Sequence, residues 1–205
     1  MSTGRLVVGV TGASGAIYAQ RFLRHAARAF EEVHLILSAN AVDVALTELG
    51  VVIDRARFSA LDWLGQECPN IRLCDEKDYF TPPASGSFLH DGMVIVPCSM
   101  GTAGRIANGV SDSLMTRAAD VCLKEGRKLI VVPREMPMSV IMLRNLATLA
   151  EAGATVIPAC PAWYHRPASV EDLADSVVAR ILQSLGVEQS LFGEWMNSEK
   201  GLESL

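Results

Sequence analysis

Short apolar runs alternate with helical patterns along almost the whole chain, and this alternation constrains the fold more than any other feature of the sequence. The apolar runs have the length and β-branched content of buried strands, and the segments between them show the apolar spacing of helices. Strands and helices that alternate in this way form a parallel sheet covered on both faces. We therefore predict an α/β fold with a doubly wound, mostly parallel sheet in three layers.

The chain is long enough for one full-sized core, and we expect a single domain over residues 1–205. The predicted strands cover residues 5–11, 33–38, 71–75, 92–99, 128–133 and 154–158. The predicted helices cover residues 15–30, 39–49, 101–109, 112–125, 138–152 and 170–185, with a weak helical pattern near 61–64. The tail, about 186–205, is more polar but holds Phe192 and Trp195, and we expect it to dock on the body or on a neighbouring subunit.

Composition and charge exclude several classes of protein. The net charge is −5 and the arginines are scattered, which argues against a nucleic-acid binder. No apolar stretch approaches the roughly 20 residues that a membrane span needs, and the first residues lack the pattern of a signal peptide. The five cysteines form no CxxC pair and the four histidines form no HxxxH pair, so we predict reduced thiols, no metal and a cytoplasmic protein.

Small, hydroxyl-bearing and charged residues follow the predicted strands. TGASG (11–15), Ser38, PCSMGT (97–102), PREMP (133–137) and PACPAWYHRP (158–167) each begin where a strand ends. Ligands of doubly wound sheets bind outside the carboxyl ends of the strands, where these segments meet. The sequence therefore predicts the functional site at this edge of the sheet.

TGASG lies between a predicted strand and a predicted helix, as phosphate-binding turns do. Its glycines allow close approach of the backbone, Ser14 adds a hydroxyl, and the helix N-terminus presents N–H groups to an anion. The segment is neither GxGxxG nor a Walker loop, and an ordinary turn without a ligand stays open as an interpretation. SMGT (99–102) repeats the chemistry before another helix, and two such turns favour a nucleotide with one phosphate, such as FMN.

The segment VVPREMP (131–137) interrupts an apolar run with Arg134 and Glu135. Adjacent residues on a strand point to opposite faces, and an exposed ion pair contributes only about 0–1 kcal/mol. We therefore predict that Arg134 and Glu135 are not mainly each other's partners and that they serve two separate roles. Three other features have ordinary interpretations as well as functional ones: the PPASGS loop (82–87), the cations Arg117 and Lys124 on one helix face, and the YHRP segment (164–167).

Several motifs together resemble the UbiX-like flavin prenyltransferase family, formerly described as aromatic-acid decarboxylases. They are GVTGASGA (9–16), PPASGS (82–87), VPCSMGT (96–102), RAADVCLKE (117–125), VPREMP (132–137), AWYHRP (162–167) and VEDLADSVVARILQSLGV (170–187). The resemblance covers about residues 5–196. It implies a flavodoxin-like, Rossmann-type fold and transfer of a dimethylallyl group from dimethylallyl phosphate to N5 and C6 of reduced FMN.

The resemblance also implies a set of site residues. FMN would contact Gly12, Ala13, Ser14, Ser38, Ser99, Met100, Gly101, Thr102, Arg117 and Arg134. The substrate would be held by Lys124, Arg134, Tyr164 and Arg180, with Ser85 and Ser87 close to the flavin and to subunit contacts. The catalytic residues would be Ser14, Glu48, Lys124 and Glu135. The family usually forms a dodecamer with sites between subunits, and its prenylated FMN serves a UbiD-type decarboxylase.

Two places in the chain depart from the family pattern, and two other functions remain as alternatives. Ala162-Trp163 replaces the frequent Gly-Phe, and Met142 stands where histidine is common. One alternative is a related flavin enzyme that decarboxylates a cysteine peptide or a phosphopantothenoylcysteine; its usual PASANT loop and active-site histidine are missing here, since the loop reads PASGS and residues 39–60 hold no histidine. The other alternative is a non-catalytic flavin-binding subunit.

Overall fold

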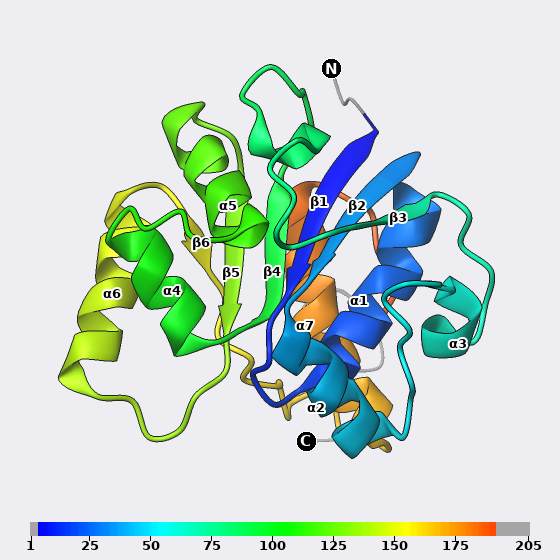
Figure 1. Ribbon diagram of the computed structural model, residues 1–205. Helices are drawn as coiled ribbons and strands as arrows, with labels where there is room; N and C mark the ends of the chain where they lie inside the picture. Colours follow the sequence, from blue (N-terminus) through cyan, green and yellow to red (C-terminus); the bar gives the residue numbers. More distant parts are fainter. Residues whose placement is uncertain (1–3, 192–205) are drawn as a thin grey trace.

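The computed structural model describes residues 4–191, and its elements follow the predicted alternation (Figure 1). The strands are β1 (Arg5–Val10), β2 (Glu32–Leu37), β3 (Ile71–Cys74), β4 (Met93–Cys98), β5 (Leu129–Pro133) and β6 (Thr155–Val156). The helices are α1 (Ala16–Ala29), α2 (Ala39–Leu49), α3 (Ala60–Leu64), α4 (Met100–Ala107), α5 (Leu114–Lys124), α6 (Val140–Glu151) and α7 (Val170–Leu185). A short 3₁₀ helix, η1 (Pro82–Ala84), occupies part of the predicted PPASGS loop.

The strands form one parallel sheet in the order β3-β2-β1-β4-β5-β6, which confirms the predicted fold class. This is the order of doubly wound nucleotide-binding folds, and it reverses direction between β1 and β4. The reversal leaves a crevice at the carboxyl ends of these two strands, because the helices that follow them cover opposite faces of the sheet. The topology therefore places the expected ligand site at the carboxyl ends of β1 and β4, on the edge of the sheet predicted from the sequence.

Helices cover both faces of the sheet and divide the core into two clusters (Figure 1). One cluster lies under α1, α2, α3 and α7, and the other under α4, α5 and α6. Val94 and Ile95, adjacent on the central strand β4, are both fully buried, one in each cluster. This is the alternation expected of a strand with both faces covered, and it explains why the strands read as continuous apolar runs.

Serines begin most of the helices and set where the preceding strands end. Ser38, Ser99, Ser113, Ser139 and Ser169 are N-caps whose side-chain oxygens accept hydrogen bonds from backbone N–H groups in the first turn. The predicted strands 33–38 and 92–99 therefore each stop one residue early. A serine at these positions ends the strand because its hydroxyl accepts a hydrogen bond from the backbone of the next helix.

Two strands differ from the expected pattern because of proline. β6 is only two residues long, but Ile157 and Ala159 continue the pairing by donating to the carbonyls of Val131 (2.9 Å) and Pro133 (3.0 Å). Pro158 lies between them and has no N–H to contribute. In β4, Pro97 lies within a shift of register between Ile95 and Cys98, where a central strand tolerates proline.

The last described residue, Leu191, lies against the body of the protein. Leu191 is partly buried against the core beneath α1 and α7. The predicted docking of the tail concerns mostly residues 192–205, which lie outside the described part of the chain. Within residues 4–191, no helix is long and apolar enough to cross a membrane.

At the amino end of the sheet, two buried histidines enclose an aromatic ring. Phe88 packs edge-on against His34, with ring centroids 4.8 Å apart, and stacks on His90 at 5.7 Å. The Arg5 guanidinium lies 5.4 Å from the centre of the same ring. Burial lowers the pKa of both histidines, although Glu32 opposes this effect at His34. The two histidine rings thus remain neutral near pH 7. They pack on Phe88 and so hold the segment that follows the PPASGS loop against the sheet.

These histidines predict a loss of stability in mild acid. Because their pKa values are lower in the folded chain than in the unfolded one, the unfolded chain takes up protons first as the pH falls below about 6.5. Each histidine can then remove up to about 1.4 kcal/mol of stability per pH unit until it protonates in the folded state. We expect urea unfolding midpoints to fall between pH 7.5 and 5.5. A His34→Gln, His90→Gln double variant should show a flatter pH dependence, and an equally steep one would refute the assignment.

Candidate active site

Thr11 joins β1 to β4 at the point where the strand order reverses. Its side chain is buried, and its hydroxyl donates to the carbonyl of Pro97 (2.7 Å) while it accepts from the N–H of Ser99 (2.9 Å). The Thr11 side chain thus adds to the backbone bond from its own N–H to the Pro97 carbonyl (3.3 Å) in holding the TGASG and SMGT turns side by side. Thr11 was not among the predicted site residues, although its place as the first residue after a strand was a usable signal.

A cavity of about 440 Å³ opens beside this junction. The N-termini of α2, α4 and α5 converge on it, and the first N–H groups of a helix have no partner within the helix. Its walls carry hydroxyl groups and charges of both signs, with Arg105 and Asp112 paired at 3.2 Å. The lining includes Thr11, Gly12, Ser38, Asn40, Ser99, Gly101, Thr102, Arg105, Asp112, Ser113 and Thr116.

Gly12 allows α2 to approach the first turn closely. A Cβ atom placed on Gly12 would lie 2.3 Å from the Cβ of Asn40 and 3.1 Å from its carbonyl carbon. Any larger residue would push the start of α2 away from β1. The glycine is thus explained by backbone approach within the chain itself, and it brings Asn40, another residue absent from the predicted set, to the cavity.

Glu48 closes the N-terminus of α1. Its carboxylate accepts from the N–H groups of Gly15 and Ala16, both at 2.8 Å. Burial acts to raise the pKa of Glu48, but hydrogen bonds from Ser14, Ala16 and Gly15 together outweigh it and hold the pKa below its usual value. An internal carboxylate therefore occupies the position where the sequence predicted a ligand anion, since both need the same backbone donors.

Arg134 and Glu135 have different partners, as predicted. Arg134 donates from Nε to the carbonyl of Ser14 (3.0 Å), whereas Glu135 accepts from the N–H of Met136 (3.1 Å). The reason differs from the predicted one, because β5 ends at Pro133 and both residues lie in the turn before α6. The turn, rather than the alternation of a strand, separates the two side chains.

The structure thus gathers many of the predicted residues at the carboxyl edge of the sheet. They are Gly12, Ala13, Ser14, Ser38, Glu48, Ser99, Met100, Gly101, Thr102, Arg134 and Glu135.

Lys124 lies elsewhere in the chain, at the far end of α5. Helices of a doubly wound fold run opposite to the strands, so this end is at the amino edge of the sheet. Lys124 donates to Glu125 at 2.6 Å, and a Cβ on Gly86 would lie 3.2 Å from its Nζ. Lys124 is therefore grouped with the PPASGS loop. A strand of six residues such as β4 spans about 20 Å, so that distance separates this group from Arg134.

The PPASGS loop is held by arginines. Arg117 donates to the carbonyl of Ala84 (3.1 Å) and pairs with Asp120 (3.0 Å), while Arg127 donates to the carbonyls of Gly86 and Phe88. Within the loop, the hydroxyls of Ser85 and Ser87 lie 2.8 Å apart. In this chain Arg117 thus positions the loop that carries both serines.

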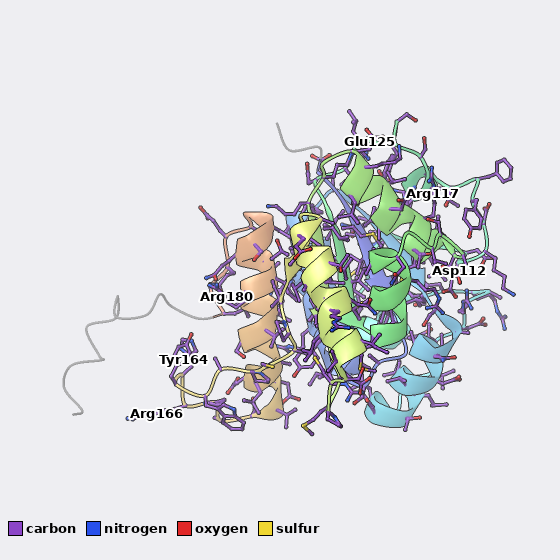
Figure 2. All side chains as sticks on the ribbon, turned by 90° about the vertical axis from the view of Figure 1, so that its left-hand side faces the viewer. Asp112, Arg117, Glu125, Tyr164, Arg166 and Arg180 are labelled. Carbon is purple, nitrogen blue, oxygen red and sulfur yellow. The ribbon has the colours of Figure 1, made fainter. Side chains whose placement is uncertain are left out.

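Tyr164 and Arg180 lie on the outer side of α7 and the loop before it (Figure 2). Tyr164 is 58% exposed and packs against the His165 ring, with centroids 4.0 Å apart. Arg180 is exposed and donates to Gln183 at 2.8 Å. Figure 2 places them on the side away from Arg117 and Glu125, so a single chain does not bring the predicted phosphate ligands together.

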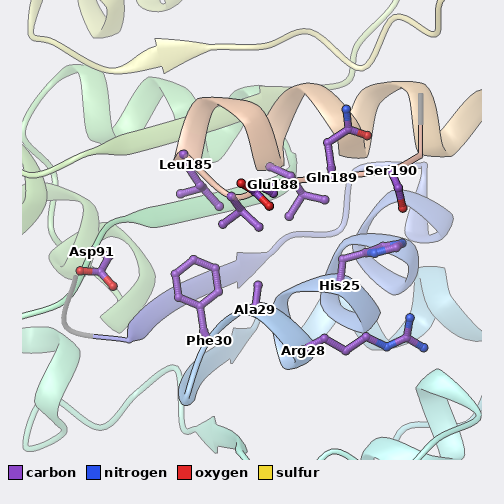
Figure 3. Close-up of a pocket in the computed structure, with 12 residues that line it drawn as sticks. His25, Arg28, Ala29, Phe30, Asp91, Leu185, Glu188, Gln189 and Ser190 are labelled. Atoms are coloured by element: carbon purple, nitrogen blue, oxygen red, sulfur yellow. The ribbon is translucent and has the colours of Figure 1, made fainter. Parts of the chain in front are cut away.

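The largest cavity described, about 720 Å³, is at the opposite edge of the sheet (Figure 3). It lies between the ends of α1 and α7 and is lined by His25, Arg28, Phe30, Leu185 and Glu188, among others. None of the predicted site residues borders it. Among residues 4–191, no group of histidine, cysteine and acidic residues is arranged to hold a metal ion.

Comparisons with known proteins assign the chain to a family. Residues 1–182 match the Flavoprotein family. The flavin prenyltransferase UbiX of Pseudomonas aeruginosa is 44% identical over 93% of both chains, and that of Thermoplasma acidophilum is 45% identical over 93% of this chain and 99% of its own. The chain belongs to the UbiX family of flavin prenyltransferases.

Solved structures of UbiX proteins have the same fold. The crystal structure of AnUbiX (PadA1) in complex with FMN and dimethylallyl pyrophosphate has a TM-score of 0.85 and 37% identity, covering 95% of this chain and 98% of its own. A dodecameric FMN-dependent UbiX-like decarboxylase from Escherichia coli O157:H7 has a TM-score of 0.82 and 38% identity, over 93% and 98%. The cysteine decarboxylase TvaF, at 19% identity and a TM-score of 0.57, shares the fold alone.

The hydrogen bonds of Glu48 predict a specific loss of stability. Glu48→Gln removes the negative charge at the start of α1, and we expect a loss of about 1 kcal/mol, since the carboxylate is exposed and caps of this kind contribute about 0.5–2 kcal/mol. The pKa of Glu48 is lower in the folded chain than its ordinary value of 4.5. The difference in stability from the parent should therefore be fully present above pH 4.5 and should vanish as the pH falls through the lower pKa of the folded state. Urea unfolding measures it, with Glu151→Gln, an exposed carboxylate at the end of α6, as control. Equal stabilities for Glu48→Gln and the parent at pH 7 would contradict the assignment.

Proposed function

We propose that this chain transfers the dimethylallyl group of dimethylallyl phosphate to reduced FMN, and that a UbiD-type decarboxylase uses the prenylated FMN. The observation that carries the proposal is the crevice between β1 and β4, where helix N-termini meet beside Ser14, Glu48 and Arg134. Full-length similarity to named flavin prenyltransferases, and to a structure that contains FMN and dimethylallyl pyrophosphate, supports the same reaction.

The crevice fits FMN in size and in chemistry. Its volume of about 440 Å³ is within the range of cofactor pockets. The N-termini of α2 and α4, with the hydroxyls of Ser38, Ser99 and Thr102, suit a phosphate and a polar side chain. We assign the phosphate of FMN to these helices, because Glu48 already occupies the donors at the start of α1.

The charged residues suit the loss of an allylic phosphate. When bound, reduced FMN supplies the electron-rich ring atoms that accept the allyl group. The C–O bond of the substrate breaks, and its electron pair leaves with the phosphate. Arg134, fixed by the carbonyl of Ser14, can stabilise this leaving group together with Lys124, Tyr164 and Arg180. Glu135 can take up the proton released on ring closure.

We propose a homo-oligomeric assembly, a dodecamer as in the UbiX-like protein of Escherichia coli, with the site completed between subunits. Lys124, Ser85 and Ser87 lie at the edge of the sheet opposite Arg134. In the assembly, Arg134 of a second copy lies beside them and completes the site. The segment after Arg134 also leaves apolar side chains exposed: Met136 by 86% and Ile141 by 71%. Such surface is typical of subunit contacts.

We propose further that residues 1–205 act as one flavoprotein domain in the cytoplasm. All five cysteines are free thiols, and four of them are buried in the core. This agrees with a reducing compartment. Fractionation of cells that express the protein would test the location.

The decisive assay uses FMN, a reductant and either dimethylallyl phosphate or dimethylallyl diphosphate without oxygen. We expect the mass of the extracted flavin to increase by one isoprenyl unit. Bound FMN without this increase, with either donor, would refute the prenyltransferase and leave a flavin-binding subunit. Release of carbon dioxide from a C-terminal cysteine peptide would instead support the related decarboxylases.

The role of Glu135 predicts a separation of binding from turnover. Glu135→Gln keeps the shape of the side chain but removes its basicity, so FMN affinity should stay within about twofold while product formation falls at least about 100-fold. Fluorescence titration of FMN and the rate of flavin mass increase measure the two effects. Glu151→Gln, at the far end of α6, is the matched control, and unchanged turnover in Glu135→Gln would remove that residue from the mechanism.

The separation of Lys124 from Arg134 predicts complementation between two inactive proteins. If each site takes Lys124 from one chain and Arg134 from another, assemblies that mix Lys124→Ala and Arg134→Ala chains contain some intact sites. Unfolding and refolding an equal mixture should restore roughly a quarter of the parent activity. Each variant refolded alone provides the control. If the mixture is no more active than the separate variants, both residues belong to a site within one chain.

A further inference from the structure

We infer that Ser176 is a positioning residue for the loop that carries Tyr164, an inference that rests on the proposed function. Ser176 lies on α7 and is 6% exposed. Its hydroxyl donates to the carbonyl of Leu173 (2.7 Å) and accepts from the N–H of Ala162 (3.0 Å). The bond within the helix consumes the hydroxyl proton, so the oxygen faces the loop as an acceptor.

Ala162 is in the middle of a loop whose two ends are held by hydrogen bonds to different elements. Near the start, Ala159 donates to the carbonyl of Pro133 (3.0 Å), which continues the sheet. Near the end, Ala168 donates to Asp172 (2.9 Å) in the capping turn of α7. The bond to Ser176 joins the intervening backbone to α7 two residues before Tyr164. It therefore bears directly on where the Tyr164 hydroxyl lies.

Asp175, the residue before Ser176, joins α7 to α1. Asp175 is buried and receives two hydrogen bonds from Arg21 of α1, one of them from Nε at 2.7 Å. The side-chain contacts thus run from the Tyr164 loop through Ser176 to α7, and through Asp175 to α1. Since α1 begins just after Ser14 and α7 carries Arg180, these contacts connect the Tyr164 loop to the helices next to a predicted catalytic residue and a predicted substrate ligand.

The test compares Ser176→Ala with Ser176→Thr. Alanine favours the helix and should fold, but it removes the acceptor for Ala162. We expect the KM for dimethylallyl phosphate to rise about tenfold, the ratio that corresponds to one ordinary hydrogen bond, while FMN affinity stays within about twofold. Threonine keeps the hydroxyl and should restore KM to within about threefold of the parent. Thr148→Ala removes a similar bond, to the carbonyl of Arg144 on α6 (3.0 Å), and is the control.

A double-mutant cycle with Tyr164→Phe separates positioning from general structural damage. If Ser176 acts through the Tyr164 hydroxyl, Ser176→Ala should change KM by less than about twofold in the Tyr164→Phe background. Equal effects in both backgrounds, or an unchanged KM in Ser176→Ala, would overturn the inference while the prenyltransferase assignment stands. A parent KM in Tyr164→Phe would overturn it together with the role of Tyr164. A parent protein that transfers no prenyl group refutes the proposed function itself.

Discussion

The hydrogen bonds of Thr11 hold the centre of the structure together at the point where the order of strands reverses. One hydroxyl links the end of β1 to the end of β4 across the middle of the sheet. In a doubly wound fold these two strands send their helices to opposite faces, and the Thr11 hydroxyl reinforces the backbone pairing of β1 with β4 where the helices diverge. The cavity, the converging helix N-termini and the turn that contains Ser14 all depend on this junction.

The helix N-termini at this edge differ in whether a carboxylate of the chain already balances their partial positive charge. The start of α1 is already neutralised by Glu48, whereas the starts of α2, α4 and α5 face the cavity. A ligand phosphate placed at α1 would have to displace a carboxylate held by two backbone donors and by Ser14. The same contacts keep the pKa of Glu48 low, so this carboxylate remains charged near pH 7 and orients Ser14. The turn that most resembles a phosphate loop thus already holds an internal carboxylate.

Two groups of predicted site residues lie at opposite edges of the sheet, about 20 Å apart in one chain. Ser14, Glu48 and Arg134 belong to the carboxyl edge of the sheet, while Lys124 and the PPASGS loop belong to the amino edge. Internal contacts position both groups, such as that of Arg134 with Ser14 at one edge and those of Arg117 and Arg127 with the loop at the other. Their separation is a property of the folded chain, and it is the basis of the proposed assembly between copies.

Local patterns in the sequence predicted the succession of strands and helices along the chain and the edge of the sheet where small and charged residues gather. This was possible because apolar periodicity and serine caps act locally, within a few residues of each other. Tertiary structure alone decided that Glu48 closes α1, that Thr11 joins two strands, that Ser176 holds the Tyr164 loop and that Lys124 lies far from Arg134. These contacts join residues remote in sequence, such as Gly15 with Glu48 and Thr11 with Pro97, and no local pattern encodes them. They exist because parallel crossovers bring distant chain segments to a common edge.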